Sequence, residues 1–296
     1  MSVDPPRPPE AASLAERVAS RLRAPGVNPP PPLAAEKARA PDPVAIADAI
    51  DIPGQPPTEP LQINFAKLQV AGFITPSAPT TGNTEAIRVI KRQLLKTAFP
   101  QGHHGAVGSN ANVIMVTSSM PGEGKTFLSL NLAMSFCAER DLFVLLIDGD
   151  GHRRFLGGLL GAKEDVGLVD ILVDHKLRVG DLIQRTNVPN LSFLSGGRSH
   201  PHSSELLASK QFGLLMQDIA ARYPDRIILI DTPPVLASAE AVVLSGHVGQ
   251  TVVVVEKDRT SKRQLQRTLE MLEGGRNVGC ILNFVPPEEN FAGYGY

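Results

Sequence analysis

From residue 112 onward, short apolar runs alternate with longer segments of helical periodicity. Because the runs are short and contain no polar alternation, they are typical of strands buried on both faces. They lie at 113–116, 143–147, 191–194, 227–230, 252–255 and 278–282, and helical periodicity fits 124–138, 203–222, 238–246 and 260–273. This order predicts an α/β fold, a doubly wound and mostly parallel sheet with helices on both faces.

The first 60 residues have a different composition. They hold 15 of the 26 prolines, so we expect a disordered Pro-rich N-terminal tail. Ser13-Leu-Ala-Glu16 has the form of a capping box, and Leu14, Val18 and Leu22 follow at every fourth residue. This predicts a short amphipathic helix over 13–23, either a partner-binding helix or a frayed one.

Residues 61–110 form a segment between the tail and the alternating pattern. It opens on an apolar lead-in over 61–75 and continues with a helix over 84–96, whose Ile87, Ile90 and Leu94 mark one face. Residues 102–110 are expected to be a linker. The remaining boundaries follow, with a domain over 111–286 and a C-terminal tail over 287–296.

Composition narrows the possible partners and compartment. The net charge of −1 gives no reason to expect nucleic-acid binding. Cys137 and Cys280 lie in apolar stretches, so we expect reduced core thiols and a cytoplasmic protein. No apolar stretch is long enough to span a membrane and no secretory signal opens the chain, so contact with the inner membrane would need a partner.

The segment 113–126 reads as a buried strand, a glycine turn and the start of a helix, an arrangement that binds nucleotide phosphates. Amides in the turn can point at phosphate oxygens, Lys125 can neutralise their charge, and the Thr126 hydroxyl can ligate Mg²⁺. The first glycine of the usual motif is replaced by Ser119. The predicted nucleotide-binding residues are Ser119, Met120, Pro121, Gly122, Glu123, Gly124, Lys125, Thr126 and Phe127.

Acidic residues close two of the apolar strands. Asp148 and Asp150 follow the strand at 143–147, and Asp231 follows the strand at 227–230. Parallel strands end at the same edge, so all three carboxylates are expected near Lys125. One of the paired acids can orient Mg²⁺ and the other can accept a proton from an attacking hydroxyl. The following 152–154, His-Arg-Arg, could hold phosphate charge or be a solvated basic loop.

Three segments of the chain, taken in combination, resemble the Walker A, A′ and B motifs of bacterial tyrosine kinases. They are, in that order, Ser-Ser-Met-Pro-Gly-Glu-Gly-Lys-Thr126, Leu-Leu-Ile-Asp148-Gly-Asp150 and Ile-Asp231-Thr-Pro-Pro234. The helix with Glu85, Arg88 and Lys91 resembles the family's self-association helix. Residues 191–209 resemble its loop-and-helix signature. The Arg-Val-Ile-Lys-Arg run and the closing Gly-Tyr-Gly-Tyr296 are most similar to the exosortase-associated tyrosine autokinases.

The resemblance implies an ATP- and Mg²⁺-dependent autokinase on a P-loop NTPase fold that regulates exopolysaccharide export. It implies that Lys125, Asp148 and Asp150 are catalytic, with Asp148 the proton acceptor, and that Thr126, Asp148 and Asp231 serve the metal. Tyr294 and Tyr296 would be phosphoacceptors between subunits of a ring-like homo-oligomer. The activator would be a membrane chain-length regulator, or polysaccharide co-polymerase. His152 replaces the family's usual Arg, Glu240 receives no role, and Tyr223 reads as a core residue at a helix end.

Two other functions remain open. A ParA/MinD-like ATPase switch would carry a second lysine five positions before Lys125, where this chain has Met120. A nucleotide-binding, non-catalytic regulator of polysaccharide assembly fits the short tail with only two tyrosines. A dinucleotide oxidoreductase is a poor fit, because no GxGxxG follows the first strand of the core.

Overall fold

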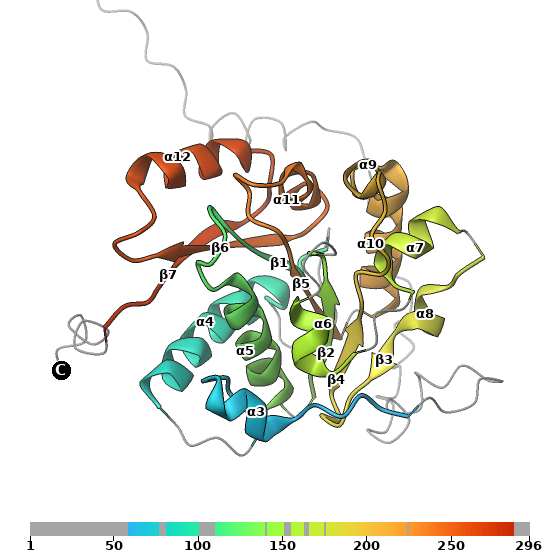
Figure 1. Ribbon diagram of the computed structural model, residues 1–296, viewed down its shortest axis with the longest axis horizontal. Helices are drawn as coiled ribbons and strands as arrows, with labels where there is room; N and C mark the ends of the chain where they lie inside the picture. The colour runs from blue at the N-terminus through green and yellow to red at the C-terminus, as the bar shows by residue number, and fades with distance from the viewer. Residues whose placement is uncertain are drawn as a thin grey trace, which may run out of the picture. The chain divides into compact units, whose positions relative to one another are not determined.

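The computed structural model describes residues 59–76, 81–100, 110–139, 141–150, 155–162, 166–174, 176–223 and 225–286. Within them, seven strands form one sheet in the order β3-β4-β2-β5-β1-β6-β7 (Figure 1). Neighbouring strands are parallel, except that β3 runs antiparallel to β4. The strands are β1 Val113–Ser118, β2 Phe143–Asp148, β3 Gln184–Arg185, β4 Leu191–Leu194, β5 Arg226–Asp231, β6 Gln250–Glu256 and β7 Val278–Asn283.

The central strands are buried on both faces because alternate side chains enter two separate cores. In β1, Ile114 and Val116 belong to the core on one face, and Val113 and Met115 to the core on the other. A strand with water on neither side needs no polar residue, which explains the continuous apolar runs in the sequence.

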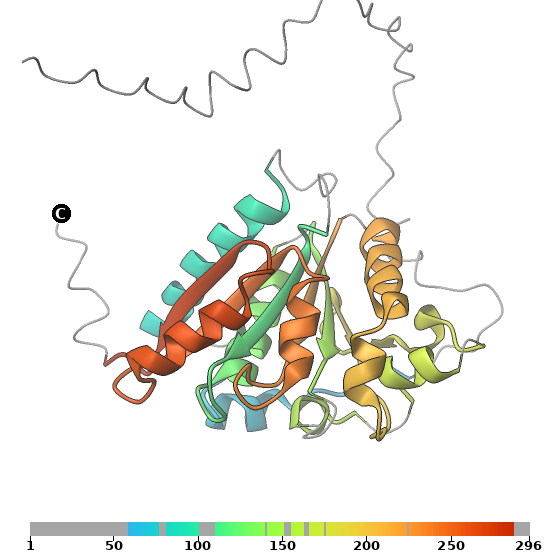
Figure 2. The same ribbon diagram turned by 90° about the horizontal axis from the view of Figure 1, so that it is seen from above.

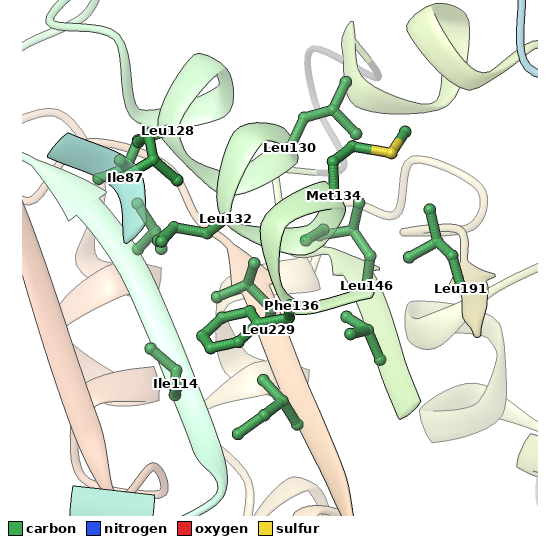
Figure 3. Close-up of a cluster of buried hydrophobic side chains, with 14 of the residues drawn as sticks. Ile87, Ile114, Leu128, Leu130, Leu132, Met134, Phe136, Leu146, Leu191 and Leu229 are labelled. Atoms are coloured by element: carbon green, nitrogen blue, oxygen red, sulfur yellow. The ribbon is translucent and has the colours of Figure 1, made fainter. Parts of the chain in front are cut away.

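One face is covered by α3 Phe65–Val70, α4 Gly82–Ala98, α5 Lys125–Cys137 and α6 Phe155–Leu160. Helix α5 is apolar nearly all round and lies between the sheet and α4. Figure 3 shows its Leu128, Leu132 and Phe136 packed with Ile87 of α4 and with side chains of the strands. The helix that starts at the phosphate loop is therefore fixed along its length.

The other face is covered by α7 Leu168–Val173, α8 Val179–Leu182, α9 Ser203–Leu207, α10 Lys210–Arg222, α11 Ala239–Ser245 and α12 Lys262–Met271. Figure 2 shows α10, α11 and α12 on the side of the sheet opposite to α4. Helix α12 begins with a capping box at Ser261 and buries Thr268. The doubly wound fold class is thus confirmed.

Several details differ from the sequence prediction. The helix expected over 203–222 is two helices, because Ser209 is the N-cap of α10 and its side chain accepts the N–H of Phe212. The apolar lead-in contains the short helix α3, and Val70 at its end is 92% exposed. The core position expected for Cys280 is wrong, since it is exposed on the edge strand β7. Cys137 is half-buried, and burial raises the pKa of its thiol to about 12.

The segment before α3 is bonded to the β3 edge of the sheet, the edge opposite to β7. Leu61 donates its N–H to the carbonyl of Arg185, and Asn187 bonds the backbone of Ile63 in both directions. No described helix is long and apolar enough to cross a membrane. The Pro-rich tail over 1–58, the helix predicted over 13–23 and most of the 102–110 linker lie outside the described residues.

Candidate functional site

The phosphate loop lies at the carboxyl end of β1, between β5 and β6. Gly122 and Gly124 have φ values of 91° and 92°, which side chains with a Cβ rarely adopt. A Cβ on Gly124 would also lie 2.2 Å from Nδ2 of Asn283. The loop therefore requires glycine at these turns, and Gly124 is the N-cap from which α5 runs.

Lys125 forms an ion pair with Asp150, one of the three predicted acids. Its Nζ lies 2.9 Å from Oδ2 of Asp150, and both side chains are nearly buried. The Lys125 ammonium also donates a 3.4 Å hydrogen bond to Oγ1 of Thr126. The structure thus places Lys125 and Asp150, which are 25 residues apart in the chain, in contact.

Asp231 is bonded to the first turn of α5. The Thr126 hydroxyl donates to Oδ2 of Asp231 at 2.7 Å, and the Ser129 hydroxyl donates to Oδ1 at 3.0 Å. Burial raises the pKa of the Asp231 carboxyl, while Lys125 and the two hydroxyls oppose that rise. Ser129 was not anticipated from the sequence, although its place one turn after Lys125 is a usable signal.

Asp148 lies directly beside Asp231, because the two residues are register partners on the adjacent strands β2 and β5. It is 3% exposed and accepts the N–H of Asp150 at 3.0 Å. Burial, with the negative charges of Asp231 and Asp150 nearby, raises the pKa of Asp148 to about 6. This carboxylate is therefore more basic than an ordinary aspartate and is suited to accepting a proton near neutral pH.

Hydroxyl groups brace the loop from the β6–α12 side, a feature that the sequence did not reveal. Ser119, which stands in place of the usual glycine, accepts a 2.9 Å hydrogen bond from the buried Thr268 of α12. Glu123 is 1% exposed; its carboxylate accepts the N–H of Met120 and the hydroxyl of Thr260. The loop is thus held in shape by α12 and the turn that precedes it.

A groove of about 840 Å³ opens beside the loop, between α4, α5 and the edge strand β7. Phe127 lines it and packs against Phe73 with ring centroids 4.9 Å apart. Asn283 and the 60% exposed Phe284 close the groove at the end of β7. Asn283 also donates to the backbone carbonyl of Glu123, so the groove is continuous with the loop.

Asp170 fastens a second loop beside Asp148. The backbone N–H groups of Gly167 and Arg198 donate to Oδ2 of Asp170, and Nε of Arg198 donates to Oδ1 at 2.7 Å. Burial alone would raise the pKa of Asp170, but these hydrogen bonds outweigh it and the pKa is lowered. The 195–198 loop therefore lines a small cavity together with Asp148.

The three residues predicted for self-association separate into two groups. Glu85 and Arg88 are exposed and form a 3.2 Å ion pair on α4. Lys91 is buried and donates to the carbonyl of Ser135 and the carboxylate of Glu139 at the end of α5. Lys91 is thus engaged within its own subunit, and only Glu85 and Arg88 present their charges on the surface.

The donor types at the site fit Mg²⁺, which prefers oxygen ligands. Thr126 and Asp231 supply a hydroxyl and a carboxylate already within 2.7 Å of each other, and Asp148 adds a second carboxylate. No group of three His, Cys, Asp or Glu side chains forms a metal site within the described part of the chain. A metal here would therefore need nucleotide oxygens or water to complete its shell.

Some predicted residues cannot be placed. Tyr294, Tyr296 and the 152–154 segment lie outside the described residues. Tyr223 is the C-cap of α10 and packs at the edge of the core, as expected. Glu240, for which no role is predicted, is 3% exposed and accepts a hydrogen bond from Ser204.

Comparison with known proteins gives the family. No family model matches the chain. The tyrosine-protein kinase Ptk of Acinetobacter johnsonii is 32% identical over 214 residues, which are 72% of this chain and 28% of Ptk. The tyrosine-protein kinase YwqD of Bacillus subtilis is 30% identical over 225 residues, 75% of this chain and 90% of YwqD.

A solved structure agrees. The kinase domain of the Escherichia coli tyrosine kinase ETK matches with a TM-score of 0.61 at 26% identity, over 80% of this chain and 94% of that domain. The chain spans less than a third of Ptk, and its similarity to the exosortase-associated branch stays a prediction. Since YwqD is matched over nearly its whole length, the chain belongs to the family of bacterial tyrosine kinases.

Proposed function

We propose that this chain is an ATP-dependent protein-tyrosine kinase that phosphorylates the tyrosines of its own C-terminal tail. The observation that carries the proposal is the gathering of Asp148, Asp150 and Asp231 around Lys125 and Thr126. A lysine, a hydroxyl and acids at the ends of adjacent parallel strands are what phosphoryl transfer from a nucleotide requires.

Each residue has a place in binding. The amides of the 119–124 turn and the Lys125 ammonium would hold the β- and γ-phosphates, so Lys125 would exchange Asp150 for phosphate oxygens. Thr126, Asp148 and Asp231 would hold Mg²⁺, which neutralises charge on the phosphates. The groove beside Phe127 is large enough for the base and ribose, and the paired Phe rings offer an apolar wall.

In the proposed reaction, the γ-phosphoryl group of ATP is transferred to a tyrosine oxygen. The tyrosine oxygen forms a bond to the γ-phosphorus, the bond from that phosphorus to the β,γ-bridging oxygen breaks, and ADP leaves. The proton of the tyrosine hydroxyl passes to a carboxylate oxygen of Asp148, which lies at the end of β2 beside Asp231. The backbone N–H of Asp150 donates to Oδ1 of Asp148 and holds that carboxylate in place.

The acceptors and partners follow from the family resemblance. Tyr294 and Tyr296 of one subunit would reach the site of a neighbouring subunit in a ring-like homo-oligomer. Glu85 and Arg88 are exposed on α4 and suited to such a contact. The cytoplasmic kinase would meet the inner membrane through a chain-length regulator of exopolysaccharide export.

Incubation of the full chain with γ-labelled ATP and Mg²⁺ tests the proposal. The chain has only three tyrosines, so mass spectrometry can assign every phosphotyrosine. We expect label on Tyr294 and Tyr296, with more in the presence of the regulator's cytoplasmic peptide. The double variant Tyr294→Phe/Tyr296→Phe should lose the label, whereas the control Tyr223→Phe should keep it.

Two outcomes would contradict this function. Label that persists in the double variant would refute the tail as acceptor. ATP hydrolysis without any phosphotyrosine would favour the ParA/MinD-like switch, and nucleotide binding without turnover would favour a non-catalytic regulator.

A further inference from the structure

The guanidinium of Arg259 lies against the backbone of the phosphate loop. A Cβ built on Gly122 would be 3.2 Å from Nη1 and 3.7 Å from Nη2 of Arg259. Gly122 is one of the two loop glycines with a positive φ. The Arg259 side chain is 59% exposed, so its charge is at the loop and can also be reached by a ligand.

The turn between β6 and α12 fixes Arg259 in this position. Glu256 at the end of β6 accepts a 2.8 Å hydrogen bond from Nη1 of Arg259, and its own side chain is 17% exposed. The next residue, Thr260, donates its hydroxyl to Glu123 in the phosphate loop. Arg259 is therefore held by Glu256, and the residue next to it is bonded to the phosphate loop.

The backbone of the same turn is strained. Asp258 has a φ of 60°, an unusual value for a residue other than glycine. Such a conformation persists where the surroundings enforce it, often at ligand sites. Arg259 directly follows this residue.

The acids of the site outnumber its cations, so a second cation would help to neutralise a bound triphosphate. Lys125 is paired with Asp150, and Asp148 and Asp231 are buried close by. Position 120 of the loop is a methionine, so the loop itself carries no cation besides Lys125. A triphosphate would add further negative charge to this group. A guanidinium presents several N–H donors in one plane and binds phosphate oxygens in pairs.

We propose that Arg259 is a phosphate-binding residue, which contacts the β- and γ-phosphates of the nucleotide held at 118–126. The Glu256 carboxylate keeps the guanidinium at the loop before the nucleotide arrives. This inference rests on the proposed function only in that a nucleotide binds there. It does not require that the phosphate be transferred to tyrosine.

Nucleotide affinity tests the proposal directly. Competition against a fluorescent ATP analogue, with Mg²⁺ present, would give the affinities of ATP and AMP for the full chain. We expect Arg259→Gln to lower the affinity for ATP about tenfold, the effect of losing one charge-assisted contact. The affinity for AMP should be unchanged. Arg259→Lys should regain part of the loss, because it retains the charge.

Arg267→Gln is the matched control. Arg267 also pairs with a glutamate three residues away, but on the exposed surface of α12. We expect this variant to bind ATP as the wild type does, with the same melting temperature as Arg259→Gln.

Three results would overturn the inference. ATP affinity unchanged in Arg259→Gln would show that the guanidinium does not meet phosphate. Equal weakening of ATP and AMP, with a lowered melting temperature, would make Arg259 only a brace of the loop. If the wild type binds no nucleotide at all, the proposed function fails first and this inference fails with it.

Discussion

At the scale of single residues, Lys125 connects the parts of the site. It touches Asp150 and Thr126, and Thr126 in turn touches Asp231. These contacts hold the Lys125 ammonium at the end of the phosphate loop, close to where a phosphate group would bind. Replacing it should therefore weaken the binding of a nucleotide.

We expect Lys125→Met to weaken ATP binding on the order of 100-fold, since a charged hydrogen bond in a buried site is lost, and to abolish transfer. Calorimetry with Mg-ATP measures the first effect and phosphotyrosine analysis the second. The control is Lys210→Met, an exposed position on α10. Retained transfer in Lys125→Met would refute the assigned role.

Asp148 gives a prediction on pH. Its pKa in the folded protein is raised to about 6, so the charged form is disfavoured by folding. This cost is absent below the ordinary pKa near 4 and is fully present above about pH 6. Stability contributed by this group therefore falls as pH rises through that window.

Asp148→Asn should consequently stabilise the nucleotide-free protein at pH 7.5, by on the order of 2 kcal/mol, while it removes the proposed proton acceptor. The gain should shrink as the pH is lowered toward 5. Urea unfolding in EDTA at both pH values measures it. A variant that is less stable than the wild type at pH 7.5 would contradict the prediction.

The location of the site could be predicted from the sequence, because its acids stand at the ends of recognisable strands and Lys125 follows the glycine turn after another. Lys125, Asp148, Asp150 and Asp231 were all found in this way, although their roles stay predictions. The contact between Ser119 and Thr268 could not be found. Two small hydroxyls 149 positions apart carry no local signal, and only the packing of α12 on the sheet brings them together.

At the scale of elements, short connections are positioned by side-chain hydrogen bonds. Asp170 joins the start of α7 to the 195–198 loop through three N–H groups. The loop has little apolar surface of its own, so these bonds determine where it lies beside Asp148.

Asp170→Ala should lower the free energy of unfolding by about 2–4 kcal/mol, because the buried N–H of Gly167 and two N–H groups of Arg198 lose their charged acceptor. The control Asp218→Ala breaks the exposed ion pair with Arg222 on α10 and should cost less than about 1 kcal/mol. Chemical denaturation measures both. Equal losses in the two variants would show that Asp170 is not a special anchor.

Helix α4 carries a buried cation, Lys91, and an exposed ion pair, Glu85 and Arg88. Lys91→Met should lower the unfolding free energy by about 1–2 kcal/mol, because it removes the hydrogen bonds that join α4 to the end of α5. Arg88→Ala should leave stability unchanged and reduce self-association, as measured by light scattering. The reverse pattern would assign the subunit contact to Lys91 instead.

Elements were predicted well where burial is uniform and poorly where it is not. The central strands are apolar throughout because both faces are covered. The break between α9 and α10 was missed, since apolar residues continue at helical spacing across the Ser209 cap. Strand β3 has only two residues, too few to produce a periodic signal.

At the scale of the whole molecule, the sheet is closed at one edge by a segment from far away in the chain. Ile63 and Leu68 are 3% and 1% exposed, and the segment bonds to residues near β3. The fold described here therefore begins well before the phosphate loop.

A chain that starts at residue 59 should keep the melting temperature of the full chain, whereas one that starts at residue 73 should lose about 3–6 kcal/mol from the two buried side chains. Calorimetric unfolding of both truncated chains measures the difference. Equal stability of the two would show that the segment adds nothing to the core.

The hydrogen bond between Thr268 of α12 and Ser119 of the phosphate loop has an evolutionary consequence. Restoring glycine at 119 alone would leave the fully buried Thr268 without its acceptor. Replacing Thr268 alone would orphan Ser119 in the same way. The two positions should therefore change together among orthologues, with glycine at the first accompanied by an apolar residue at the second.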